Sequence, residues 1–133
     1  MFKIIENKLA TEGIGQFDYI VLNEDHHQTG DHARDSWIVA DVHDLYDDDS
    51  NSLEEYEKKI DLVWGLMQQH NRVVICCVDG ISRSNAIALG VLVKYFHMDF
   101  YEALELIREK VSMANISPGH IAQLKKLFKV TLP

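Results

Sequence analysis

The feature that most constrains the fold is an apolar run, Val73 to Cys77, followed by a short turn and a long apolar stretch from Ser84 to Phe96. A β-branched run of this length predicts a buried strand. The longer stretch is apolar nearly all round, which predicts a helix buried inside a domain. A buried strand leading directly into a buried helix is typical of α/β domains, where such turns lie at the carboxyl edge of the sheet.

The rest of the chain supplies three further strands and three further helices. Strands are expected at Phe2 to Ile5, Asp18 to Leu22 and Trp37 to Val42. Helices are expected from the capping sequence at Ser52 to about His70, from Asp99 onward, and from Ser117-Pro118 to about Phe128. We therefore expect residues 1–133 to form a single α/β domain, with a central, largely parallel sheet of four to five strands flanked by helices.

Composition and charge argue against several classes of partner. The 133 residues carry 13 Lys and Arg against 21 Asp and Glu, a formal net charge of −8. This balance disfavours a nucleic-acid backbone or an anionic membrane surface as a partner. No apolar run is long enough to cross a bilayer, and the segment from Met1 to Glu6 lacks the order of a secretory signal. We expect a cytoplasmic protein with reduced thiols.

No metal site or cofactor is expected. Cys76 and Cys77 are adjacent, so they supply neither a disulfide framework nor the spaced ligand pairs of a structural zinc site. His26, His27 and His32 lie in a polar segment and are expected to be exposed to solvent. The chemistry is therefore expected to rest on protein side chains.

The turn after Cys77 has the composition of an anion-binding loop. Its backbone N–H groups and the start of the next helix can surround a phosphate, and Gly80 permits the bend. Arg83 adds a planar fork of donors that matches two phosphate oxygens. The same field favours the thiolate of Cys77, which is the nucleophilic form. The expected phosphate-binding residues are Val78, Asp79, Gly80, Ile81, Ser82 and Arg83, with the Asp79 side chain pointing outward.

Cys77, five intervening residues, Arg83 and then Ser84 resemble the signature of the cysteine-based protein tyrosine phosphatase superfamily. The string from Gly80 to Ser84 and the later segments 103–108 and 115–124 resemble the small dual-specificity phosphatases. The resemblance covers Trp37 to about Phe128. It implies that Cys77 attacks phosphorus to form a cysteinyl-phosphate that water then hydrolyses, while Ser84 donates a hydrogen bond to the sulfur. The implied substrates are proteins phosphorylated on tyrosine, serine or threonine.

The resemblance also implies a general acid, an Asp on a loop some thirty residues before the nucleophile. Asp44 is favoured because it follows the predicted strand ending at Val42, and it lies 33 residues before Cys77. Asp47 lies 30 residues before it and is favoured instead by counting back from Leu53. Three other carboxylates remain alternatives: Asp41, Asp48 and Asp49.

One departure from the family pattern leaves a second function open. Cys76 stands where the family usually has a His that tunes the thiolate, so activity is expected to be reduced. The alternative is a weakly active or inactive domain that binds phosphorylated partners. Phosphatases acting on RNA 5′-triphosphates or phosphoinositides are minor alternatives, because those relatives usually carry basic residues where this loop has Val78 and Asp79.

Overall fold

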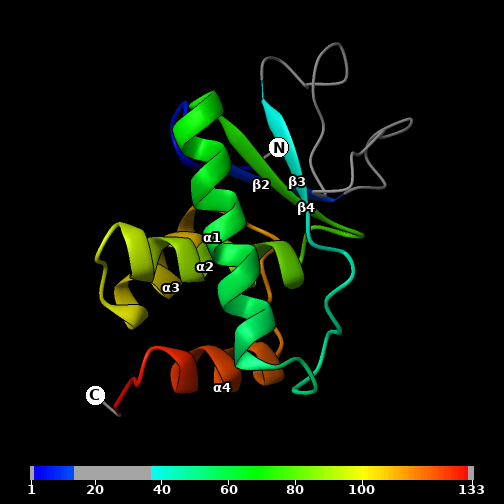
Figure 1. The fold of residues 1–133 in the computed structure, drawn as a ribbon, viewed down its shortest axis with the longest axis vertical. Coiled ribbons are helices and arrows are strands. Elements are labelled where there is room, and N and C mark those ends of the chain that lie inside the picture. Colours follow the sequence, from blue (N-terminus) through cyan, green and yellow to red (C-terminus); the bar gives the residue numbers. More distant parts are fainter. Residues whose placement is uncertain (1, 14–36, 132–133) are drawn as a thin grey trace.

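The computed structural model describes residues 2–13 and 37–131, and these ranges form four strands and four helices (Figure 1). In chain order they are β1 (Phe2–Ile5), β2 (Leu9–Gly13), β3 (Ile38–Asp41), α1 (Leu53–His70), β4 (Val73–Cys77), α2 (Arg83–Tyr95), α3 (Phe100–Lys110) and α4 (Pro118–Leu127). In Figure 1, α1 begins beside α4 and runs toward the sheet, against which it packs.

The four strands form one mostly parallel sheet in the order β1-β2-β4-β3. Strands β2 and β3 both run parallel to β4, and β1 pairs antiparallel with β2. The register places Gly13 opposite Cys77 and Asp41 opposite Cys76. The carboxyl ends of the three parallel strands therefore meet at one edge, where ligands of open α/β sheets bind.

The two faces of β4 contribute to different apolar clusters. Successive strand residues point to opposite faces, so Ile75 and Cys77 join the large core beneath the helices. Val74 and Cys76 instead join a small cluster on the other face, with Ala10, Trp37 and Val39. The side chains of the two adjacent cysteines therefore lie on opposite faces of the sheet, and of the two only Cys77 faces the helices.

Helices α1, α3 and α4 follow the predicted capping residues, and α2 begins at Arg83, one residue before the predicted Ser84. The Ser52 side chain accepts a hydrogen bond from the Glu55 amide, and that of Asp99 accepts from the amides of Tyr101 and Glu102. Ser117 occupies the N-cap position before Pro118, but its side chain makes no capping hydrogen bond. The Ser117 amide instead donates to the Ser82 hydroxyl oxygen at 2.9 Å, which ties the start of α4 to the turn after β4.

The predicted α/β architecture is confirmed, with one strand that the sequence analysis missed. Strand β2 is buried along its whole length and pairs with β4, yet its sequence Leu-Ala-Thr-Glu-Gly has little strand character. The predicted strand from Asp18 to Leu22 and the histidines at 26, 27 and 32 lie outside the described residues. Within the described ranges, no helix has the length and apolarity needed to cross a membrane.

Candidate active site

Cys77 ends β4 and lies at the base of the turn formed by residues 78–83, called here the phosphate loop. Its side chain is buried, and Sγ lies 3.4 Å from Oγ of the buried Ser84 in the first turn of α2. A thiol donates its proton along this contact, whereas a thiolate requires the Ser84 hydroxyl to donate. The geometry therefore brings together Cys77, the predicted nucleophile, and the hydroxyl that the family resemblance assigned to its sulfur.

Gly80 gives the phosphate loop its bend. Its φ is +72°, a left-handed conformation that residues with a Cβ rarely adopt. A Cβ at this position would also lie 2.6 Å from the backbone nitrogen of Gly13, because the loop packs against the end of β2. Val78 and Asp79 are exposed beside this bend, so the predicted outward direction of Asp79 is confirmed.

Asn85 holds the backbone of the phosphate loop through hydrogen bonds of its side-chain amide. Its Nδ2 donates to the carbonyl oxygens of Gly80 and Ile81, each at 3.0 Å, and its Oδ1 accepts from the Thr11 hydroxyl at 2.9 Å. In a planar trans peptide the N–H points opposite to the C=O. The amides that follow these two carbonyls, those of Ile81 and Ser82, therefore point away from Asn85, as an anion-binding loop requires.

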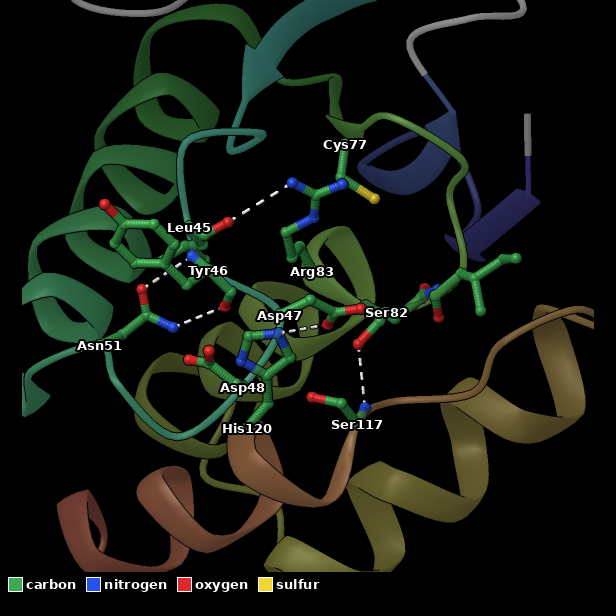
Figure 2. A network of polar contacts seen from close by, with 12 residues as sticks. Leu45, Tyr46, Asp47, Asp48, Asn51, Cys77, Ser82, Arg83, Ser117 and His120 are labelled. Carbon is green, nitrogen blue, oxygen red and sulfur yellow. Dashed lines mark hydrogen bonds and ion pairs between the residues drawn. The ribbon is translucent and has the colours of Figure 1, made fainter.

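Arg83 reaches from the start of α2 to the loop between β3 and α1 (Figure 2). Its Nη1 donates to the carbonyl oxygen of His43 at 2.7 Å and lies 3.4 Å from that of Leu45. A guanidinium has five N–H donors, so donors remain for phosphate oxygens. The loop of residues 42–52, called here the aspartate loop, is thus joined directly to the arginine predicted to bind phosphate.

Asp41 braces the beginning of the aspartate loop. Its buried carboxylate accepts a hydrogen bond from the His43 amide at 2.9 Å and also contacts Nδ1 of the His43 ring. These contacts hold the backbone turn whose carbonyl receives Arg83. Because the carboxylate is buried at the end of β3, Asp41 has a structural role in this loop.

The two favoured candidates for the general acid have different surroundings. Asp44 forms an ion pair with Lys59 of α1, with 2.9 Å between Oδ1 and Nζ. Asp47 lies beside the phosphate loop, and its Oδ1 is 2.9 Å from Nε2 of the buried His120 (Figure 2). The Ser82 hydroxyl and the Arg83 charge also act on the Asp47 carboxyl. Asp48 accepts hydrogen bonds from its neighbour Ser50.

The surroundings shift the pKa values of Asp47 and His120. Partial burial raises the pKa of Asp47, but the hydrogen bond from Ser82 and the interactions with His120 and Arg83 outweigh it, so the net shift is downward. Burial lowers the pKa of His120 and the nearby Arg83 charge adds to this, while Asp47 opposes it without reversing the shift. The pair therefore favours an ionised Asp47 beside a neutral His120.

Comparison with known proteins agrees with this arrangement. Residues 7–130 match the catalytic domain of the dual specificity phosphatases. The chain belongs to this family. Among relatives in the family, it is 36% identical over 63 residues to dual specificity protein phosphatase 1B of Arabidopsis thaliana, covering 47% of this chain and 38% of that protein. It is 30% identical over 77 residues to dual specificity protein phosphatase MPK-4 of Drosophila melanogaster, covering 58% of this chain and 20% of that protein.

Solved structures show the same fold. The crystal structure of human DUSP28 matches with a TM-score of 0.59 and 20% sequence identity, covering 64% of this chain and 60% of that one. At this sequence identity, the match shows that the two chains share a fold. The chain spans 20% to 38% of the length of the two relatives described above.

Several residues that shape the site were not recognised from the sequence. Asn85 and Thr11 are 74 positions apart, and His120 and Asp47 are 73 apart, so local patterns carry no signal for either pair. Asn85 offered one clue, because it is a polar residue directly before the apolar stretch of a buried helix, and it is itself fully buried. Buried amides need hydrogen-bond partners, and here two loop carbonyls supply them.

Proposed function

We propose that the chain is a cysteine-dependent phosphatase that hydrolyses phosphomonoesters on proteins, with tyrosine, serine or threonine as the phosphorylated residue. The single observation that carries this proposal is the contact between Cys77 and Ser84 at the base of the loop closed by Arg83. Family membership supports the same activity. We place the reaction in the cytoplasm, where a thiol nucleophile stays reduced.

In the first step the Cys77 thiolate attacks phosphorus, an S–P bond forms and the P–O bond to the substrate breaks. The amides of residues 78–83 and the Arg83 guanidinium stabilise the charge on the equatorial oxygens. In the second step water attacks the cysteinyl-phosphate, an O–P bond forms and the S–P bond breaks. The Ser84 hydroxyl, 3.4 Å from the sulfur, donates a hydrogen bond to the departing thiolate.

We further propose Asp47 as the general acid, with Asp44 as the alternative. Asp47 lies against Ser82 and near Arg83, so its carboxyl adjoins the phosphate loop. Asp44 is held in an ion pair with Lys59, which directs its side chain toward α1 and away from the phosphate loop. In the first step Asp47 gives its proton to the departing substrate oxygen, and in the second it takes one from the attacking water.

The activity is tested with wild type and Cys77→Ser on a small aryl phosphate, together with vanadate binding to both. We expect the Ser variant to lose turnover and still bind vanadate. Turnover that survives in Cys77→Ser would contradict the mechanism. A wild type that binds vanadate without turnover would instead identify a module that binds phosphorylated partners.

The acid is identified by comparing Asp47→Asn with Asp44→Asn on two substrates, phenyl phosphate and an aryl phosphate with an acidic phenol. General acids contribute about a hundredfold or more, and their contribution is greatest for poor leaving groups. We expect Asp47→Asn to slow phenyl phosphate selectively and Asp44→Asn to leave the ratio of the two rates near that of wild type. The reverse pattern would assign the acid to Asp44.

A further inference from the structure

His120 joins the aspartate loop to the interior of the domain. It lies in the first turn of α4 and is fully buried, with 0% of its surface exposed. The preceding Gly119 permits this approach, because a Cβ there would lie 2.4 Å from the carbonyl carbon of Asp48. The imidazole directs Nε2 to the Asp47 carboxylate (Figure 2). Its Nδ1 is directed to the Tyr56 hydroxyl on the other side of the ring.

The hydrogen bonds around Tyr56 determine which nitrogen of His120 carries the proton. Oδ1 of Asn51 accepts a hydrogen bond from the Tyr46 amide at 2.9 Å. Nδ2 of Asn51 is therefore the donor, and it donates to the Tyr46 carbonyl oxygen at 2.7 Å and to the Tyr56 hydroxyl at 3.3 Å. The Tyr56 hydroxyl therefore accepts from Asn51 and donates its own proton to Nδ1 of His120 at 2.6 Å. Nε2 then carries the imidazole proton and donates it to Oδ1 of Asp47 at 2.9 Å.

This series of hydrogen bonds from Asn51 through Tyr56 and His120 determines the position of the Asp47 side chain and which of its oxygens can carry a proton. Because Oδ1 receives the Nε2–H of His120, a proton on the Asp47 carboxyl has to reside on Oδ2. The geometry points to His120 as a positioning residue for the general acid, locked in its Nε2–H tautomer by Tyr56, and this inference rests on the proposed function of Asp47. The hydrogen bonds of the His120 ring go to Asp47 and Tyr56, so His120 acts through Asp47.

The charged and titratable groups around Asp47 come from every element that packs against it. They are His120 from α4, Arg83 at the start of α2, Tyr56 from α1, and Asp48 and Asp49 from the same loop. His120, Arg83 and the Ser82 hydroxyl favour the ionised carboxylate of Asp47. Loss of the His120 donor should therefore raise the pKa of Asp47 and release its side chain together.

Two substitutions at His120 test the hydrogen-bond donor of the ring separately from the volume that the ring fills. His120→Phe fills similar space without a donor, whereas His120→Gln places an amide N–H near the position of Nε2. Each is assayed with phenyl phosphate and with an aryl phosphate of an acidic phenol, across a full pH range, in wild-type and Asp47→Asn backgrounds. Tyr56→Phe is added as a variant that removes the tautomer lock and leaves His120 in place.

At the pH of maximal rate, we expect His120→Phe to lower kcat/KM for phenyl phosphate about tenfold, part of the contribution of a general acid, and to change the other substrate less than threefold. The alkaline limb of the profile should move to higher pH. His120→Gln should recover most of the loss, and Tyr56→Phe should shift the limb in the same direction by less. In the Asp47→Asn background, His120→Phe should cause no further loss.

The outcomes distinguish this inference from the proposed function. The inference alone is overturned if the wild type is active and depends on Cys77, but His120→Phe keeps the wild-type leaving-group dependence and alkaline limb. A loss that persists in the Asp47→Asn background also overturns it, because His120 would then act on something other than the acid. An inactive wild type overturns both. If His120→Phe fails to fold, the pH–rate profiles of His120→Gln and Tyr56→Phe decide. Profiles unchanged from wild type in both variants would show that Tyr56 does not fix the tautomer of His120, and the inference would be overturned.

Discussion

Nη1 of Arg83 donates a 2.7 Å hydrogen bond to the carbonyl oxygen of His43, so the side chain proposed to bind phosphate and the aspartate loop are physically joined. The buried Asp41 carboxylate holds that turn through the His43 amide and ring. A disturbance at Asp41 should therefore reach Arg83 without any direct contact between the two side chains. Arg83 and His43 are 40 residues apart in sequence, and the bond between them uses a backbone carbonyl that every residue type at position 43 would retain.

Asp41→Ala tests this link. The variant leaves the His43 amide without its acceptor, which should cost about 1–3 kcal/mol of unfolding free energy and loosen the turn under Arg83. We expect vanadate to bind several-fold more weakly, measured by titration of the folded protein. Asp99→Ala is the matched control, because it removes the N-cap of α3, also at a cost of about 1 kcal/mol, away from the phosphate loop. Equal vanadate affinities in the two variants would separate Asp41 from phosphate binding.

Asn85→Ala should damage the phosphate loop more than its partner variant Thr11→Val. The first removes both hydrogen bonds to the loop carbonyls of Gly80 and Ile81, while the second removes only the bond behind Asn85. We expect Asn85→Ala to weaken vanadate binding about tenfold and Thr11→Val to weaken it less, by titration at one pH. Thr11→Val reaching or exceeding the loss in Asn85→Ala would show that the amide contacts do not shape the loop.

Gly80→Ala and Gly65→Ala form a pair with opposite expected effects. At Gly80 the left-handed φ and the 2.6 Å approach to Gly13 make a methyl group strained, so stability should fall by at least about 1–3 kcal/mol and turnover should be lost. Gly65 lies within α1, and a Cβ there would meet nothing within 4 Å. Alanine at 65 should therefore stabilise the helix by about 0.5–1 kcal/mol. Urea unfolding measures both; a neutral Gly80→Ala would refute the strained bend.

The sequence was sufficient for the phosphate loop because its signals are local. A β-branched strand, a glycine, an arginine at fixed spacing and a buried helix are contiguous, so Cys77, Gly80 and Arg83 could each be assigned a position before the structure was known. Strand β2 escaped because its burial comes from its neighbours β1 and β4, which its own short sequence does not report. The one local clue was Asn7, which adopts a positive φ of 62° in the turn between β1 and β2.

The choice between Asp44 and Asp47 could not be made from spacing, since two carboxylates three residues apart fit the same pattern. Their surroundings differ through long-range contacts, with Lys59 beside one and His120 beside the other. Tyr56 is a fully buried core residue of α1. Its hydroxyl also serves a polar network, which periodicity does not report.

The buried, neutral His120 should make stability depend on pH in a window set by its own titration. Its pKa in the folded chain lies below the ordinary value of 6.5, because burial disfavours the charged ring. As pH falls through 6.5, the unfolded chain binds a proton that the folded chain does not, so the free energy of unfolding decreases. Asp47, whose pKa is lowered from 3.8, adds its loss only at more acid pH.

Urea unfolding of wild type and His120→Phe at pH 8, 7, 6 and 5 measures this window. The other histidines are common to both proteins, so they cancel in the difference between the two curves. Between pH 6.5 and 5 the wild type should lose stability more steeply than the variant, by up to about 1.4 kcal/mol per pH unit for one proton. The variant should retain only the pH dependence of the remaining groups. Parallel curves would mean that His120 accepts a proton in the folded chain as readily as in the unfolded one, which its burial between Tyr56 and Asp47 argues against.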